Sequence, residues 1–154
     1  MESLIYFSVL LICFLGILIG VLISYFAREE LKDGKKYFIL SKNALFALTI
    51  FFLIYFLNIE LVFNLFISLT LAAILFKFKI KESIVYVLMG LIFYFSSLNE
   101  VLFKINASLI FLYGIFAGSL FMEKNIKLSK MGLIKNLFVN YVWFFVLGAV
   151  LGVF

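Results

Sequence analysis

The chain has 154 residues, of which 67% are hydrophobic and only 14% charged, and its net charge is +5. This apolar fraction excludes a soluble globular domain, in which roughly 45–50% of residues are apolar, and indicates an integral membrane protein. The basic residues occupy short segments between apolar stretches, whereas a nucleic-acid-binding surface needs one continuous basic face. We therefore expect the lipid bilayer, and no nucleic acid, among the partners of this chain.

Six apolar segments follow one another along the sequence. A backbone in hydrocarbon must satisfy its own amide groups, so each segment is expected to form a helix. The sequence thus predicts an all-α fold, a polytopic membrane bundle of about six transmembrane helices that forms a single integral membrane domain over residues 1–154. The expected spans are Leu4–Phe26, Tyr37–Leu57, Leu61–Phe76, Ile84–Leu98, Val101–Met122 and Leu137–Phe154.

Positive charge alternates with these spans. Every lysine and arginine except Lys104 lies in one of three short segments, namely Arg28, Lys32, Lys35, Lys36 and Lys42, then Lys77, Lys79 and Lys81, then Lys124, Lys127, Lys130 and Lys135. Because basic loops are retained in the cytoplasm, these segments are expected inside and both termini outside, in a multi-pass protein of the cell membrane. Lys104 is expected to reach the outer surface and to pair with Glu100 one helical turn earlier.

The boundaries of three spans carry further expectations. The first helix is predicted to continue beyond the membrane through Lys32 and to stop at Gly34, since glycine readily adopts the left-handed conformation that ends helices. The third and fourth spans are shorter than the roughly 20 residues that cross a bilayer. Either Phe78 and Ile80 extend them while the neighbouring lysines reach the headgroups, or the bilayer thins there, or the pair forms a re-entrant hairpin.

Three pairs of glycines recur at the spacing Gly-x-x-x-Gly. Apolar helices gain no hydrophobic free energy by leaving lipid, so they associate where small residues let their backbones approach closely. The first and fifth spans run in the same direction with glycines at similar depth, and they are predicted to touch each other or to form a subunit contact. The helix-packing candidates are Gly16, Gly20, Gly114, Gly118, Gly148 and Gly152.

Polar residues within or beside the spans are the candidates for a functional site. Carboxylates at outer turns also stabilise a following helix N-terminus, and buried amides such as Asn140 commonly join helices. If a polar path exists, the sequence places it at the outer ends of the third and fifth spans. The candidate polar cluster is Glu60, Asn64, Glu100, Lys104 and Asn106.

The residues of catalysis are nearly absent. The chain has no histidine, its single aspartate is Asp33 outside the spans, and its single cysteine is Cys13 within an apolar run. No metal-ligand spacing, phosphate-binding loop or serine–histidine pair is found. We therefore expect no catalytic residue, no cofactor and no metal, and a protein that is not an enzyme.

One segment resembles a known family. Residues 27–38, read as Ala-Arg-Glu-Glu-Leu-Lys-Asp-Gly-Lys-Lys-Tyr-Phe directly after a membrane helix, are similar to a juxtamembrane segment in the C-terminal region of archaeal prepilin and preflagellin peptidases. That family consists of aspartyl membrane proteases with a catalytic Asp in a Gly-x-Gly-Asp motif. This chain lacks the motif, so the resemblance implies an archaeal-like relative of a noncatalytic portion.

Two classes of function fit the sequence. The first is a non-enzymatic accessory or structural subunit that binds other membrane components, either another membrane protein or a second copy of itself. The second is a small transporter or channel protomer, in which the short third and fourth spans would have a functional role.

Overall fold

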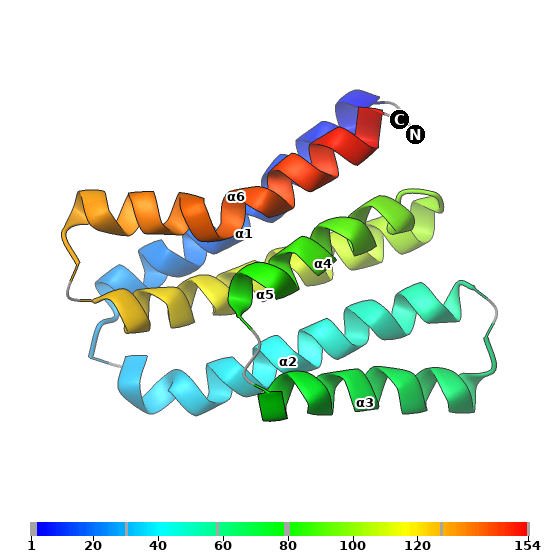
Figure 1. Ribbon diagram of the computed structural model, residues 1–154, viewed down its shortest axis with the longest axis horizontal. Helices are drawn as coiled ribbons and strands as arrows, with labels where there is room; N and C mark the ends of the chain where they lie inside the picture. The colour runs from blue at the N-terminus through cyan, green and yellow to red at the C-terminus, as the bar shows by residue number, and fades with distance from the viewer. Residues whose placement is uncertain (1–2, 30, 58, 79–80, 127, 154) are drawn as a thin grey trace.

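The computed structural model describes residues 3–29, 31–57, 59–78, 81–126 and 128–153. These residues form six α-helices (Figure 1), which confirms the expected all-α fold. The helices are α1 Ser3–Phe26, α2 Leu31–Tyr55, α3 Leu61–Phe78, α4 Glu82–Ser96, α5 Glu100–Asn125 and α6 Lys130–Val153.

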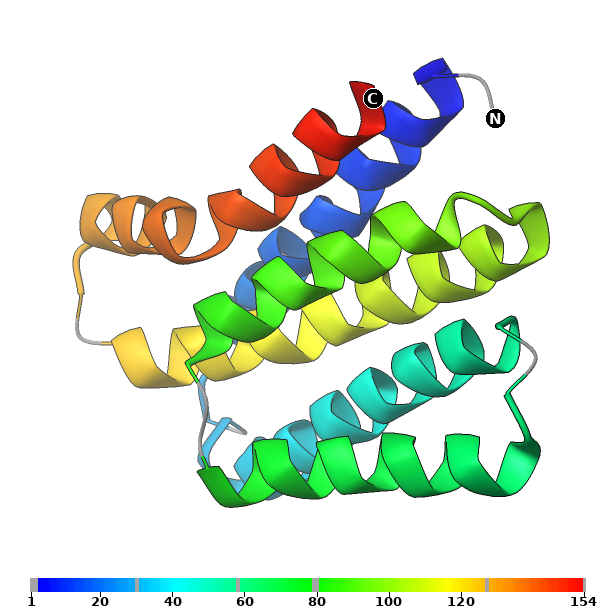
Figure 2. The same ribbon diagram turned by 45° about the vertical axis from the view of Figure 1, so that its right-hand side comes forward.

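Helix α5 is the centre of the bundle. Of the residues in the most apolar stretch of α5, 61% are buried inside the bundle, against 33% for the corresponding stretch of α1 and 22% for those of α2 and α6. Helices α1 and α2 pack against α5, α4 packs against α6, and α3 packs on the side of α2. Figures 1 and 2 show the outcome, with α2 and α3 on one side of α5 and α1 and α6 on the other.

Aromatic side chains fill the space between α1, α4, α5 and α6. Tyr6 lies 5.1 Å from Phe93 between ring centroids, and Phe93 lies 5.0 Å from Phe103. Phe93 and Phe144 have no exposed surface. Since aromatic rings gain from edge-to-face contact beyond simple burial, this cluster fixes how the helices meet around α5.

Within the described residues, four helices are long and apolar enough to cross a membrane: α1, α2, α5 and residues Met131–Val153 of α6. The apolar parts of α3 and α4 are shorter, as the sequence predicted. The helices also extend beyond the expected spans, since α2 begins at Leu31 rather than Tyr37 and α6 at Lys130 rather than Leu137. Hydropathy locates the part that suits hydrocarbon, whereas backbone hydrogen bonding continues the helix into polar sequence.

The expectation that the first helix stops at Gly34 is wrong. Helix α1 ends at Phe26, and Gly34 lies in the first turns of α2. The side chain of Leu31 is buried with only 3% of its surface exposed, which anchors the start of α2. Asp33 in the first turn also favours a helix N-terminus at this point through the helix dipole.

Several buried serine and threonine hydroxyls are satisfied by their own helices. Thr49, Ser68 and Ser96 each donate to the carbonyl oxygen four residues earlier, at 2.7, 2.9 and 2.7 Å. In α6, Asn140 donates in the same way to the carbonyl of Asn136 at 2.7 Å. This bond competes with the backbone ladder, and α6 bends about its middle in Figures 1 and 2.

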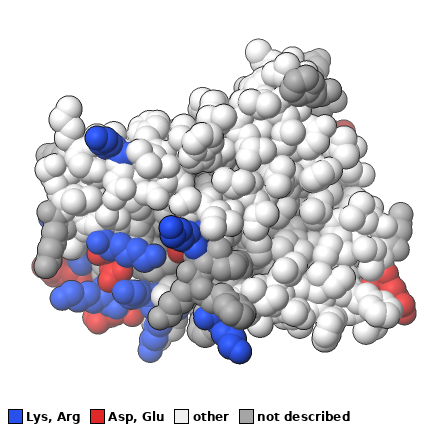
Figure 3. Space-filling view, in the orientation of Figure 1, with Lys and Arg blue, Asp and Glu red and all other residues white. Residues whose placement is uncertain are grey.

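The two ends of the bundle differ in charge. The α1–α2 and α5–α6 connections lie at one end, which we call the basic end, and α3 and α4 are joined on the same side but short of that end (Figure 1). The start of α1 and the end of α6 lie at the opposite end. Most of the blue lysine and arginine surface in Figure 3 gathers over the basic end. Lys79 and Lys127 of the predicted basic groups, and the expected extension at Ile80, lie outside the described residues.

Candidate functional site

The structure places the five residues of the predicted polar cluster in separate contacts. Asn64 of α3 is fully buried and donates to the carbonyl of Phe51 in α2 at 3.0 Å. Asn106 of α5 is also fully buried and donates to Ser96 Oγ of α4 at 2.8 Å. Each of these amides joins a different pair of helices.

The remaining members of that cluster lie on the surface. Glu100 and Lys104 form the expected ion pair along α5, at 2.6 Å, with 76% and 71% of their side chains exposed. Glu60 is exposed just before α3. A common role of the five residues in a polar path stays a prediction.

The candidate packing glycines all face other helices of the same chain. A Cβ atom added at Gly16 or Gly20 of α1 would overlap the backbone of Phe111 or Ile115 in α5. Added atoms at Gly114 and Gly118 would meet the backbone of α1 around Ile17. The two helices therefore approach each other through backbone atoms, as small-residue spacing allows.

The glycines of α6 face α1 instead. A Cβ atom at Gly148 would lie 2.6 Å from Leu10 Cδ1, and one at Gly152 would overlap the ring of Tyr6. Tyr6 also donates its hydroxyl to the carbonyl of Gly148 at 2.8 Å. Both α5 and α6 thus hold α1 by close contact.

At the basic end, α4 is much shorter than its neighbours. With a rise of 1.5 Å per residue, α4 is about 22 Å long and α5 about 39 Å. A three-residue turn, 97–99, joins the two helices at the opposite end. Helix α4 therefore stops well short of the basic end, and Figure 1 shows α3 stopping at a similar level.

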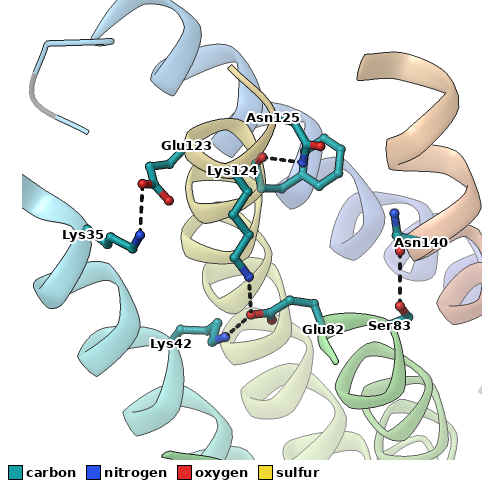
Figure 4. A network of polar contacts seen from close by, with 9 residues as sticks. Lys35, Lys42, Glu82, Ser83, Glu123, Lys124, Asn125 and Asn140 are labelled. Atoms are coloured by element: carbon teal, nitrogen blue, oxygen red, sulfur yellow. Dashed lines mark hydrogen bonds and ion pairs between the residues drawn. The ribbon is translucent and has the colours of Figure 1, made fainter. Parts of the chain in front are cut away.

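An ion network closes over the start of α4. The carboxylate of Glu82, the first residue of α4, accepts from Lys42 Nζ of α2 at 2.6 Å, and their side chains are 19% and 11% exposed. Lys124 extends from the end of α5 and brings its Nζ to 3.8 Å from the same oxygen (Figure 4). A second pair, Lys35–Glu123 at 3.0 Å, joins α2 to α5 nearby.

A chain of amides connects α4, α5 and α6 on the other side of Glu82. Ser83 donates to Asn140 Oδ1 at 3.3 Å, and Asn140 donates to Asn136 Oδ1 at 3.0 Å. Asn136 in turn donates to Asn125 Oδ1 at 3.1 Å. These bonds orient three side-chain amides around the same end of the bundle.

Between the ion network and the amides lies a cavity of about 310 Å³, which we call the polar recess. Two of its buried groups lack partners within the described part of the chain. Glu82 Oε2 is buried without a hydrogen bond, and no hydrogen bond involves the hydroxyl of Tyr141, a residue only 1% exposed. The recess is lined by Lys81, Glu82, Ser83, Phe121, Lys124, Asn125, Asn140 and Tyr141.

Two further phenols lie next to Tyr141. The ring centroid of Tyr86 is 5.0 Å from that of Tyr141 and 5.6 Å from that of Tyr113. Tyr86 and Tyr113 are fully buried, and neither hydroxyl makes a hydrogen bond of good geometry to a described residue, although that of Tyr113 faces the Glu82 carboxylate. Buried polar groups are normally hydrogen-bonded, so two unpaired hydroxyls in a bundle interior are unusual. Because they lie next to Tyr141, they extend the polar character of the recess toward the centre of the bundle.

A larger cavity of about 480 Å³ lies between α1 and α5 and includes Cys13 and Phe111 in its walls. Apart from Cys13, the polar side chains of this lining are those of Lys104 and Ser108, and the remaining residues are apolar. A ligand in this cavity would therefore make mainly hydrophobic contacts. The polar recess offers charges, amides and hydroxyls that can select a ligand by its chemistry.

Sequence reasoning missed most of the recess. Lys42, Glu82 and Lys124 belong to loop-like, charged sequence, so nothing in hydropathy distinguished them from topology determinants. The available signals were weak: a single acid, Glu82, follows a group of three lysines, and Asn125, Asn136 and Asn140 recur around the last connection. Only folding onto a short α4 brings them together.

Comparisons with family models, with curated proteins and with solved structures find no significant match to this chain.

Proposed function

We propose that the protein is a non-enzymatic, multi-pass protein of the cell membrane that binds other membrane components, and that the polar recess receives them. All six helices cross the bilayer, the basic end faces the cytoplasm, and both termini face outside. The three basic connections all join the helices on the same side of the bundle, which supports this orientation because positive loops are retained inside.

The short helices α3 and α4 fit this topology if the protein surface dips at the basic end. An α4 of about 22 Å is shorter than the 30 Å of hydrocarbon, so headgroups and water must reach below the usual interface to meet Glu82. Lys42 and Lys124 can extend from longer helices to the same depth, as basic side chains do near interfaces. The re-entrant hairpin is the competing arrangement.

One observation carries the proposed binding role. Glu82 is held by lysines from two other helices, yet its Oε2 atom is buried without a partner beside a polar cavity. Among the described residues, Glu123 Oε2 of the Lys35–Glu123 pair is likewise buried without a partner, so the unpaired oxygen alone does not distinguish Glu82. What distinguishes Glu82 is its place in the wall of the polar recess, beside two lysines and the unpaired hydroxyl of Tyr141, which a bound molecule could contact.

Extraction of the full chain from its native membranes in mild detergent tests this role. We expect a membrane component, either a lipid or a membrane protein, to co-purify in fixed proportion to the chain. The variant Lys124→Gln alters the recess and should retain less of that component. The matched variant Lys104→Gln removes an exposed lysine at the opposite end and should retain it fully. Recovery of a solitary chain, or equal retention by both variants, would argue against binding at the recess.

A small transporter is the second candidate. The unpartnered hydroxyls of Tyr86 and Tyr113 favour it, because they continue the recess toward the centre of the bundle. Beyond them Met89, Phe93 and Phe144 are fully buried, so transport would need these side chains to move apart. A flux into liposomes that disappears in Tyr86→Phe or Tyr113→Phe, or on replacing Glu60, Glu100 or Asn106 of the predicted polar cluster, would favour transport over binding.

Kinship with a noncatalytic portion of archaeal prepilin peptidases is retained as a third proposal. Of the resembling segment, residues 27–29 follow α1 and residues 31–38 form the first turns of α2. They lie at the basic end, as expected of a juxtamembrane segment. Such kinship would explain the evolutionary origin of the chain, and it is compatible with the proposed binding role.

A further inference from the structure

The start of α4 has the features of an anion-binding site. Lys81 occupies the N-cap position, and no side chain caps the helix there. The first amides of an α-helix have no partner within the helix, and its dipole favours negative charge at that end. Glu82 and Ser83, the first two residues of α4, both line the polar recess.

The charges around the recess also favour an anion. Lys81 and Lys124 line it, and Lys42 approaches from α2, while Glu82 is the single acid of the lining. Lys42 already neutralises Glu82 at 2.6 Å, whereas Lys124 stands at 3.8 Å with 57% of its side chain exposed. Lys81 is exposed and makes no ion pair within the described residues. Two ammonium groups are therefore available to a ligand.

The recess also offers polar groups beyond its lysines. The Tyr141 side chain lines it, is 1% exposed and has a hydroxyl without a partner among the described residues. Ser83, Asn125 and Asn140 add a hydroxyl and two amides to the same lining. The recess, at about 310 Å³, is larger than an inorganic phosphate, which would leave most of these groups without a ligand atom. A quaternary ammonium headgroup would add positive charge to a basic site.

We propose that the polar recess binds a phosphate ester of a small polyol, such as a glycerol phosphate group. The phosphate lies at the N-terminus of α4 between Lys81 and Lys124, where it also accepts from Tyr141. The polyol hydroxyls bond to the side chains of Ser83, Asn125 and Asn140, which line the recess. The group is either the headgroup of an anionic lipid or a soluble polyol phosphate, and both present the same atoms. This inference rests on the proposed function, because it names the component that the recess receives.

Binding to the purified full-length chain tests this assignment. In detergent, equilibrium dialysis measures the binding of radiolabelled glycerol phosphate and its competition by inorganic phosphate. In nanodiscs, native mass spectrometry measures retention of phosphatidylglycerol relative to phosphatidylcholine. We expect glycerol phosphate to bind more tightly than inorganic phosphate, and phosphatidylglycerol to be retained over phosphatidylcholine. Binding in the nanodiscs alone identifies a lipid headgroup, and binding in dialysis alone identifies a soluble ligand.

Three conservative variants locate the bound group. Lys81→Gln and Lys124→Gln each remove one charge-assisted contact and should weaken binding about ten-fold or more. Tyr141→Phe removes a single hydroxyl while keeping the ring, and should weaken it by a smaller factor. The control is Lys104→Gln, which lies on the exposed face of α5 at the opposite end and should bind like the unmodified chain. Far-ultraviolet circular dichroism shows that each variant retains its helices.

Absence of binding in both arms overturns the assignment, as does equal binding by Lys81→Gln, Lys124→Gln and Lys104→Gln. Failure of the assignment is distinguishable from failure of the proposed function. If a component without phosphate co-purifies from native membranes and is lost in Lys124→Gln, the binding role stands and the ligand class is wrong. If the chain is solitary and binds neither probe, both fail.

Discussion

At the scale of single residues, the bundle treats its polar groups in two ways. Donor groups such as the Thr49 hydroxyl and the Asn106 amide NH2 find a partner on their own or an adjacent helix. Glu82 instead gathers two lysines on one oxygen and lines the polar recess. The sequence could predict that Asn64 and Asn106 are buried, since they lie in apolar runs. It could not predict the surroundings of Glu82, which depend on where three separate helices end.

The variant Glu82→Gln tests the structural weight of this carboxylate. It leaves Lys42, whose side chain is only 11% exposed, without its anionic partner. Because an unsatisfied buried group is destabilising by about 1–3 kcal/mol, we expect the free energy of unfolding to fall by that order. Thermal unfolding of the purified protein, followed by circular dichroism, measures the change.

The matched control is Glu100→Gln, which breaks the exposed pair with Lys104 and should change the unfolding midpoint little. Equal effects of the two variants would mean that the ion network at the start of α4 has no special structural role.

At the scale of helices, glycine spacing predicts the contact between α1 and α5. Gly16 and Gly20 meet the backbone of α5, and Gly114 and Gly118 meet the backbone of α1. Helix ends were harder to predict. Gly34 resembles a helix stop in sequence, yet the burial of Leu31 makes it part of α2. A tertiary contact, absent from any local pattern, decided that boundary.

The variant Gly20→Ala tests the α1–α5 contact. Its added methyl group would overlap the backbone of Ile115, so the two helices must separate. Overpacking of this kind costs about 1–3 kcal/mol, and we expect a loss of stability in that range. The measurement is again the thermal unfolding of the purified protein.

Gly132→Ala provides the comparison, because a Cβ atom there would come no closer than 3.3 Å to Ser129 Oγ. If Gly20→Ala is no less stable than Gly132→Ala, backbone contact between α1 and α5 is not what holds them together.

At the scale of the whole molecule, charge and helix length together describe how the protein lies in a membrane. The number of helices and the grouping of basic residues at one end followed from hydropathy and lysine placement. The recess could not be predicted in this way. It forms because α4 is shorter than α5, so that the packed helices leave a depression above the start of α4. The orientation of the bundle and the function of the recess depend on each other, since a ligand from the cytoplasm requires the basic end to face it.

Cysteine labelling at Lys81 tests the central claim, that all six helices cross the bilayer with the basic end in the cytoplasm. The background is Cys13→Ala, which removes the single native cysteine. Lys81→Cys is compared with Leu128→Cys in the α5–α6 connection and with Leu98→Cys in the turn at the opposite end, two positions 43% and 76% exposed. We expect an impermeant maleimide to label positions 81 and 128 only from the cytoplasmic side, and position 98 only from outside. Labelling of position 81 from outside, or from neither side while the two comparison positions behave as expected, would contradict the claim.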